Sequence, residues 1–158
     1  MMYEDLVSDF ADRTRRNLEV IDRLKDDPES DVFEVTQLIN SMLGLLVFPR
    51  ENFLDRIPEI PLAELKQRGW PQIREITTEE SFDPPENLRE LVKYLRNSIA
   101  HFNIKFRPEN GVIRGITVWN IKGGKKNWTA NLNLEELREF TLKFVELLRD
   151  EELIGGAR

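Results

Sequence analysis

Apolar residues recur every three or four positions in four segments of the chain, which is the spacing of amphipathic α-helices. These segments cover roughly residues 4–25, 31–47, 86–102 and 133–148. Three strand-like runs lie between the last two segments, at 104–107, 112–121 and 126–132. The turns between these runs contain Asn110-Gly111 and Gly123-Gly124, which are typical of tight antiparallel hairpins. The pattern predicts a mainly α protein with a minor α+β component: an antiparallel helical bundle with a small β-meander inserted before the last helix.

Capping residues and turn geometry give these elements more definite boundaries. Asp31 with Glu34, and Asn133 with Glu136, have the spacing of capping boxes that begin helices. Centring the second hairpin on Gly123-Gly124 places Trp119 directly opposite Trp128, as a cross-strand aromatic pair.

Two further segments bear on how the helices pack. The helix at 31–47 is apolar around most of its circumference near its end, so it is either buried in the core or shared with a partner chain. Ser41 and Gly44 would allow another helix to approach it closely. The proline-rich connection from 49 to 85 is expected to wrap over the core, with a short helix at 62–68 closed by Gly69 and with Trp70 and Phe82 holding it down.

Composition limits the classes of protein that the chain can belong to. With 158 residues, 40% hydrophobic and 33% charged, the chain is expected to form a single soluble domain over 1–158. The sequence has no apolar run of the ~18 residues that a membrane span needs and no secretory signal, so we expect a cytoplasmic protein without membrane contact. The absence of cysteine and the single histidine argue against a thiol nucleophile, a metal site or a cofactor held by such ligands.

The single histidine, His101, lies at the end of the helix predicted at 86–102. At about 100° per residue, this helix carries one apolar band. The band consists of Leu88, Leu91, Val92, Leu95, Ile99 and Phe102. Arg96, Asn97 and His101 fall on the face turned away from this band, so His101 is either a solvated residue or part of a site.

The run Arg96-Asn97-Ser98-Ile99-Ala100-His101 resembles the signature of the HEPN (higher eukaryotes and prokaryotes nucleotide-binding) superfamily, in which an arginine and a polar residue precede a histidine at this kind of spacing. The wider layout resembles a plasmid-borne HEPN subgroup linked to toxin and defence systems. The resemblance rests on two long N-terminal helices, the Phe-Pro-Arg-Glu segment at 48–51, the motif helix, a β-meander with Trp119 and a final helix.

This resemblance implies a metal-independent endoribonuclease that forms 2′,3′-cyclic phosphate ends, in a toxin–antitoxin or phage-defence system. Its partners would be RNA or a nucleotide, a second copy of the chain in a homodimer, and a cognate antitoxin or other protein. His101 would act as acid or base and Arg96 would stabilise the phosphate charge, because imidazole can transfer protons and guanidinium matches phosphate oxygens. Acid and base together need a second histidine, which the facing motif of a dimer would supply.

Three other residues of this helix are candidates for supporting roles. Asn97 would orient the imidazole or bind the phosphate. Lys93 and Arg89, one and two turns earlier, either extend a positive strip that binds substrate or are ordinary charges of a solvated helix face.

Two alternative functions are compatible with the sequence. A net charge of −6 argues against a surface that coats nucleic acid by bulk charge, so the chain is alternatively a non-catalytic HEPN module that binds a nucleotide, RNA or a protein. The apolar helix at 31–47 also allows a purely structural dimer or an antitoxin-like partner.

Overall fold

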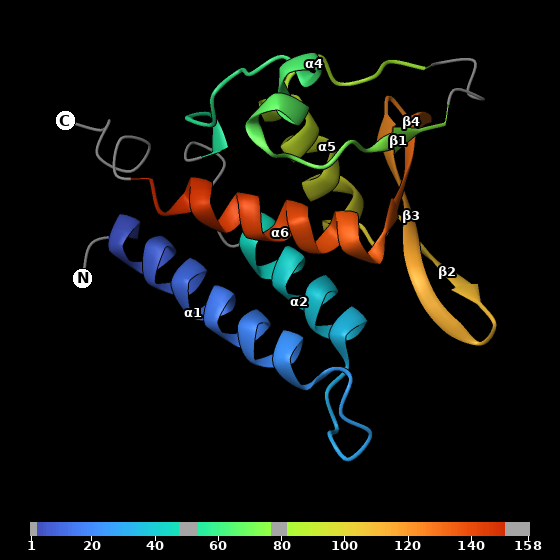
Figure 1. The fold of residues 1–158 in the computed structure, drawn as a ribbon. Helices are drawn as coiled ribbons and strands as arrows, with labels where there is room; N and C mark the ends of the chain where they lie inside the picture. Colours follow the sequence, from blue (N-terminus) through green and yellow to red (C-terminus); the bar gives the residue numbers. More distant parts are fainter. Residues whose placement is uncertain (1–2, 48–53, 77–81, 151–158) are drawn as a thin grey trace.

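Helices and strands follow the order expected from the sequence in the computed structural model, which describes residues 3–47, 54–76 and 82–150 (Figure 1). The helical elements are α1 (Tyr3–Leu24), α2 (Glu34–Val47), α4 (Leu62–Leu65), the 3-10 helix η1 (Lys66–Arg68), α5 (Leu88–Ala100) and α6 (Leu134–Leu148). The strands are β1 (Arg74–Glu75), β2 (Ile104–Glu109), β3 (Val112–Lys122) and β4 (Lys125–Asn133). The predicted mainly α fold, with a β-meander before the last helix, is confirmed.

The long helices form one bundle whose core lies between them and the sheet. Helix α1 contacts α2 and α6, α2 contacts α5 and α6, and α5 packs on β3 (Figure 1). A Cβ atom at Gly44 would lie 2.7 Å from the Phe10 ring, so this glycine does allow α1 to approach α2 closely. Leu38, Met42 and Leu45 of α2 are fully buried, which confirms that α2 contributes to the core, while Leu43 on the same helix is 42% exposed.

The start of α2 differs from the capping box predicted at Asp31. The helix begins at Glu34, and Phe33 lies outside it with 70% of its surface exposed. The Glu34 carboxylate accepts a hydrogen bond from Arg138 of α6 and lies 3.8 Å from the ammonium of Lys25. The prediction was wrong because a contact distant in sequence uses the side chain that a local cap would need. The corresponding prediction at Asn133 and Glu136 is confirmed, since both hydrogen bonds of that capping box are present.

The sheet has the strand order β1-β4-β3-β2, and all its pairs are antiparallel. Both predicted turns are confirmed: Asn110-Gly111 and Gly123-Gly124 have positive φ at both central residues, as type I′ hairpins require. The pairing of Trp119 with Trp128 was wrong by one residue. Trp119 lies opposite Thr129, and Asn120 lies opposite Trp128, because a β-bulge leaves Asn127 as an extra residue of β4.

The proline-rich connection supplies the edge strand β1, which the sequence did not predict. A strand of two residues has too little local pattern to be recognised, and its pairing with β4 depends on the tertiary fold. The short helix at 62–68 is confirmed, as is its end at Gly69, whose φ is +81°. Trp70 packs edge-on against Phe140 with ring centroids 5.2 Å apart, and Phe82 packs on the core, so both aromatic anchors are confirmed.

Candidate functional site

Helix α5 carries four of the five residues predicted for the site, and the fifth, His101, directly follows its last residue, Ala100. It begins after Asn87, whose side chain accepts a hydrogen bond from the backbone N–H of Glu90, and His101 is its C-terminal capping residue. Its apolar face is buried as predicted, at Leu88, Leu91, Val92, Leu95 and Ile99. Asn97 and His101 are exposed, and Arg96 is half-buried. Five aligned apolar positions therefore fix the rotation of α5 that turns the motif away from the core.

The chain leaves α5 through a Schellman motif. The backbone N–H of Asn103 donates to the Ser98 carbonyl at 2.7 Å, and that of Phe102 donates to Ile99 at 3.1 Å. Phe102 has a φ of +57°, a left-handed conformation that normally favours glycine. This conformation turns the Phe102 side chain outward, where it is 72% exposed. The prediction that Phe102 belongs to the core band was wrong, because the helical angle on which it relied ends at Ala100.

We expect Phe102→Gly to stabilise the fold. A bulky residue in this conformation costs about 1–3 kcal/mol, and the greater freedom of glycine in the unfolded chain offsets about 0.4–1 kcal/mol of that. Urea denaturation should show an increase of about 1 kcal/mol in the free energy of unfolding. Phe102→Ala is the control, because it removes the ring and keeps the strain. A less stable Phe102→Gly variant would contradict this reading of the helix end.

Arg89 and Lys93 are held by the segment that precedes the short helix. Arg89 donates from Nε to the Ile57 carbonyl at 2.7 Å and from Nη1 to Glu59 at 2.9 Å. Lys93 Nζ lies 2.8 Å from the Asp55 carboxylate, and this hydrogen bond holds the pKa of Asp55 below its usual value. Both cations thus already have acidic partners and fix residues 55–59 to α5.

Arg96 has a different environment from the other two cations of α5. No described residue forms an ion pair with its guanidinium, and its Nε is buried without a hydrogen-bond partner. A buried donor left unpaired costs about 1–3 kcal/mol. Among the described residues, the Arg96 guanidinium therefore has no counter-charge.

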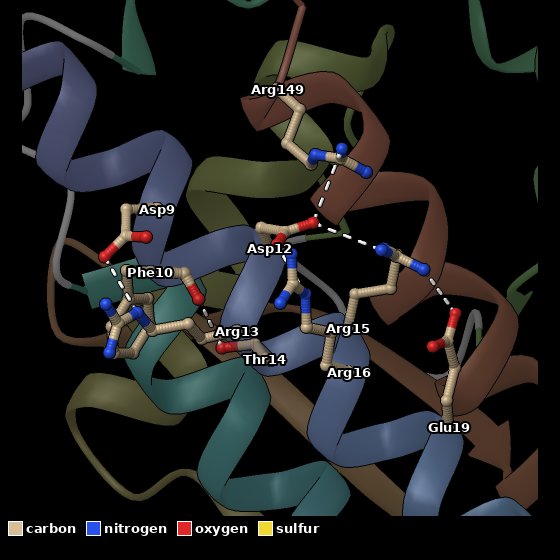
Figure 2. Close-up of polar contacts among 9 residues, drawn as sticks. All are labelled: Asp9, Phe10, Asp12, Arg13, Thr14, Arg15, Arg16, Glu19 and Arg149. Carbon is tan, nitrogen blue, oxygen red and sulfur yellow. Dashed lines mark hydrogen bonds and ion pairs between the residues drawn. The ribbon is translucent and has the colours of Figure 1, made fainter.

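The arginine cluster on α1 is neutralised by carboxylates, and Figure 2 shows its contacts. Asp12 lies 3.2 Å from Arg15, 2.8 Å from Arg16 and 3.4 Å from Arg149 at the end of α6. The hydrogen bond from Arg15 lowers the pKa of Asp12, with a further contribution from the charge of Arg16. Arg13 pairs with Asp9 at 2.9 Å. The arginines of this cluster thus already pair with carboxylates of the same chain.

Two asparagines from the sheet complete the surroundings of the motif. Asn97 Nδ2 donates to Oδ1 of Asn120 at 3.4 Å, and Asn120 Nδ2 donates to Oδ1 of Asn127 at 2.8 Å. Asn120 and Asn127 are each only 3% exposed. Neither residue was predicted from the sequence. Their presence in strands, where asparagine is depleted, is the signal that could have indicated them.

Ser98, inside the motif, ties α5 to the sheet. Its hydroxyl lies 2.8 Å from the Tyr94 carbonyl and 2.7 Å from the Trp119 carbonyl, within hydrogen-bonding distance of both. Ser98 itself is fully buried. Ser98, at a position that the HEPN signature leaves unspecified, therefore fixes α5 against β3.

The described residues contain no group of three or more histidine, cysteine, aspartate or glutamate side chains placed to hold one metal ion. Within the ranges that the structure describes, no helix has the length and apolar character needed to cross a membrane.

Comparison with known proteins gives the family of the chain. The family model described as HEPN pEK499 p136 matches residues 1–153. The chain belongs to this HEPN family. No curated protein and no solved structure matches it. Membership confirms the predicted resemblance of the chain to the HEPN superfamily, and HEPN domains are often ribonucleases. The segment 48–51, which was part of that resemblance, lies outside the described residues.

Proposed function

We propose that this HEPN protein is a metal-independent endoribonuclease whose active site combines the Arg96–His101 motifs of two protomers. The observation that carries the proposal is the contrast along α5. Arg89 and Lys93 have acidic partners, whereas no described residue pairs with Arg96, one turn before the exposed His101. A guanidinium left without a counter-charge in a chain of net charge −6 fits a phosphate ligand.

The reaction uses the 2′-hydroxyl of RNA as its nucleophile. One His101 takes the proton of this hydroxyl, and O2′ attacks the adjacent phosphorus. The bond from phosphorus to O5′ breaks, and the imidazolium of the second His101 gives its proton to O5′. The products are a 2′,3′-cyclic phosphate and a 5′-hydroxyl end. The two Arg96 side chains stabilise the charge that develops on the phosphorane oxygens.

The two substrate-binding candidates, Arg89 and Lys93, are better explained as residues that hold the fold together. A phosphate would have to displace Glu59 or Asp55 to reach them. Their ion pairs favour the interpretation as ordinary helix-face charges that fix residues 55–59. We accordingly assign the primary phosphate contact to Arg96.

The resemblance to the toxin and defence subgroup supports a setting for this activity. We propose that the enzyme acts in the cytoplasm, within a toxin–antitoxin or phage-defence system, and that a cognate antitoxin or other protein partner restrains it.

Incubating the purified protein with structured and unstructured RNAs in EDTA-containing buffer tests the proposed activity. We expect cleavage fragments with 2′,3′-cyclic phosphate and 5′-hydroxyl ends, and no cleavage at a position carrying a 2′-deoxy sugar. The non-catalytic alternative, a module that binds a nucleotide, RNA or protein, predicts a different result. Tight RNA binding without cleavage across all substrates would replace the proposed function by this alternative.

A further inference from the structure

Asn120 and Asn127 form a polar pair inside an otherwise apolar layer between α5 and the sheet. Trp128 and Ala130 of β4 and Val118 of β3, close to the pair in sequence, are fully buried apolar residues. Burying an amide in such surroundings is costly unless its hydrogen bonds are satisfied. Apolar side chains of similar size would fill the same space without that cost, so the pair calls for another explanation.

The hydrogen bonds of this pair form a continuous chain that runs in one direction. Asn97 donates to Asn120, Asn120 donates to Asn127, and Asn127 Nδ2 donates to the Tyr94 hydroxyl at 3.1 Å. The Tyr94 hydroxyl donates in turn to the backbone carbonyl of Asp83 at 3.0 Å. Burial raises the pKa of Tyr94, which keeps this hydroxyl protonated and able to donate. Every link thus has a donor and an acceptor, beginning at the exposed motif residue and ending on a backbone carbonyl.

The β-bulge in β4 lies at this chain of hydrogen bonds. It inserts Asn127 as an extra residue beside Asn120 and shifts the register between Asn120 and Ile121. Bulges re-aim side chains and are over-represented next to active sites. A regular ladder continued from Lys122 and Lys125 would have placed Asn127 directly opposite Asn120; with the bulge, Trp128 takes that place, and the Asn127 carboxamide still lies 2.8 Å from Asn120.

The consequence for Asn97 is a fixed orientation of its amide group. Its Nδ2 is directed to Asn120, so its Oδ1 remains an acceptor at the exposed side of α5. His101 lies four residues further along, and side chains at this spacing are neighbours on a helix. A carboxamide oxygen that accepts from the Nδ1–H of an imidazole selects that tautomer and leaves Nε2 free to take a proton.

We propose that Asn120 and Asn127 are positioning residues of the motif: they hold Asn97 so that its Oδ1 accepts from Nδ1–H of His101 and presents Nε2 to RNA. The inference rests on the proposed function for its catalytic meaning. The tautomer of the His101 imidazole, which the inference predicts, is measurable without RNA.

The single histidine makes that state accessible to NMR, because one imidazole gives one set of ring ¹⁵N signals. We expect the Nδ1–H tautomer to predominate in the neutral wild-type protein. Asn120→Leu, which is close in size and has no polar atoms, should shift the population toward the Nε2–H tautomer. It should also lower kcat for RNA cleavage about 10- to 100-fold, with little change in KM. Asn97→Ala, at an exposed position, should give the same tautomer change even if Asn120→Leu fails to fold.

Tyr94→Phe is the matched control, because it breaks the same chain of hydrogen bonds on the far side of the asparagine pair. It removes the Tyr94 hydroxyl, leaves Asn127 Nδ2 with the Asp83 carbonyl at 3.5 Å, and keeps the bond between Asn97 and Asn120. We expect lower stability with an unchanged tautomer and an unchanged kcat. If Asn97→Ala leaves the tautomer of His101 unchanged, the inference is overturned, even if RNA is cleaved. If the tautomer shifts but the wild-type protein cleaves no RNA, the positioning role stands and the proposed function fails.

Discussion

Replacing His101 by alanine is expected to lower the rate of RNA cleavage by at least about 10²-fold, and by up to about 10⁴-fold. In the proposed site, which would contain two copies of the same histidine, the variant removes both the base and the acid. The chain has no second histidine and no cysteine that could take over the proton transfers. The measurement is the single-turnover rate on one defined RNA, with product ends analysed as above.

The stability of the His101→Ala variant separates loss of chemistry from loss of fold. His101 is exposed at the end of α5, and substitutions at such positions usually change the free energy of unfolding by less than about 0.5 kcal/mol. Lys105→Ala, at an exposed position on β2, controls for the loss of a surface side chain near the motif and should keep full activity. Undiminished cleavage by folded His101→Ala would rule out the assigned role of this residue.

Replacing Arg96 by alanine is expected to lower cleavage by about 10²- to 10³-fold without destabilising the protein. In the proposed mechanism, the lost guanidinium stabilises charge only when the phosphate is bound. In the free protein its Nε is a buried donor without a partner, so removing it leaves no described residue unpaired. We expect urea denaturation to give a free energy of unfolding equal to or above that of the wild type.

Arg89→Ala is the matched variant on the same helix and should behave in the opposite way. It removes hydrogen bonds to the Ile57 carbonyl and to Glu59, so the free energy of unfolding should fall by about 1 kcal/mol. Cleavage per folded molecule should be unchanged, because Arg89 already has partners within the fold. Equal losses of activity in the two variants would mean that unpaired charge does not distinguish Arg96, and the assignment of the phosphate contact would be wrong.

Local sequence signals predicted the elements whose stabilising contacts are local. The capping box of Asn133 and Glu136, the two type I′ turns and the buried band of α5 all involve residues a few positions apart. Glu34 shows where such signals fail. Its spacing from Asp31 fits a cap, but its carboxylate binds Arg138, which is distant in sequence.

In the candidate site, too, residues close in sequence could be predicted, whereas contacts between residues distant in sequence could not. Arg96, Asn97 and His101 could be placed on one exposed helix face from spacing alone. Asn120 and Asn127 could not be connected to them, because the bond between Asn97 and Asn120 joins α5 to a strand more than 20 residues later. The bulge at Asn127 has no local sequence signature and caused the error in the predicted pairing of Trp119.

In the proposed enzyme, each active site needs His101 from two protomers. Mixing wild-type and His101→Ala protomers, with subunits redistributed by co-refolding at constant total protein, tests this requirement. If only dimers with two wild-type chains are active, activity should follow the square of the wild-type fraction, so an equal mixture should retain about a quarter of the wild-type rate. Activity proportional to the wild-type fraction, about one half in the equal mixture, would show that each protomer acts alone and would contradict the shared site.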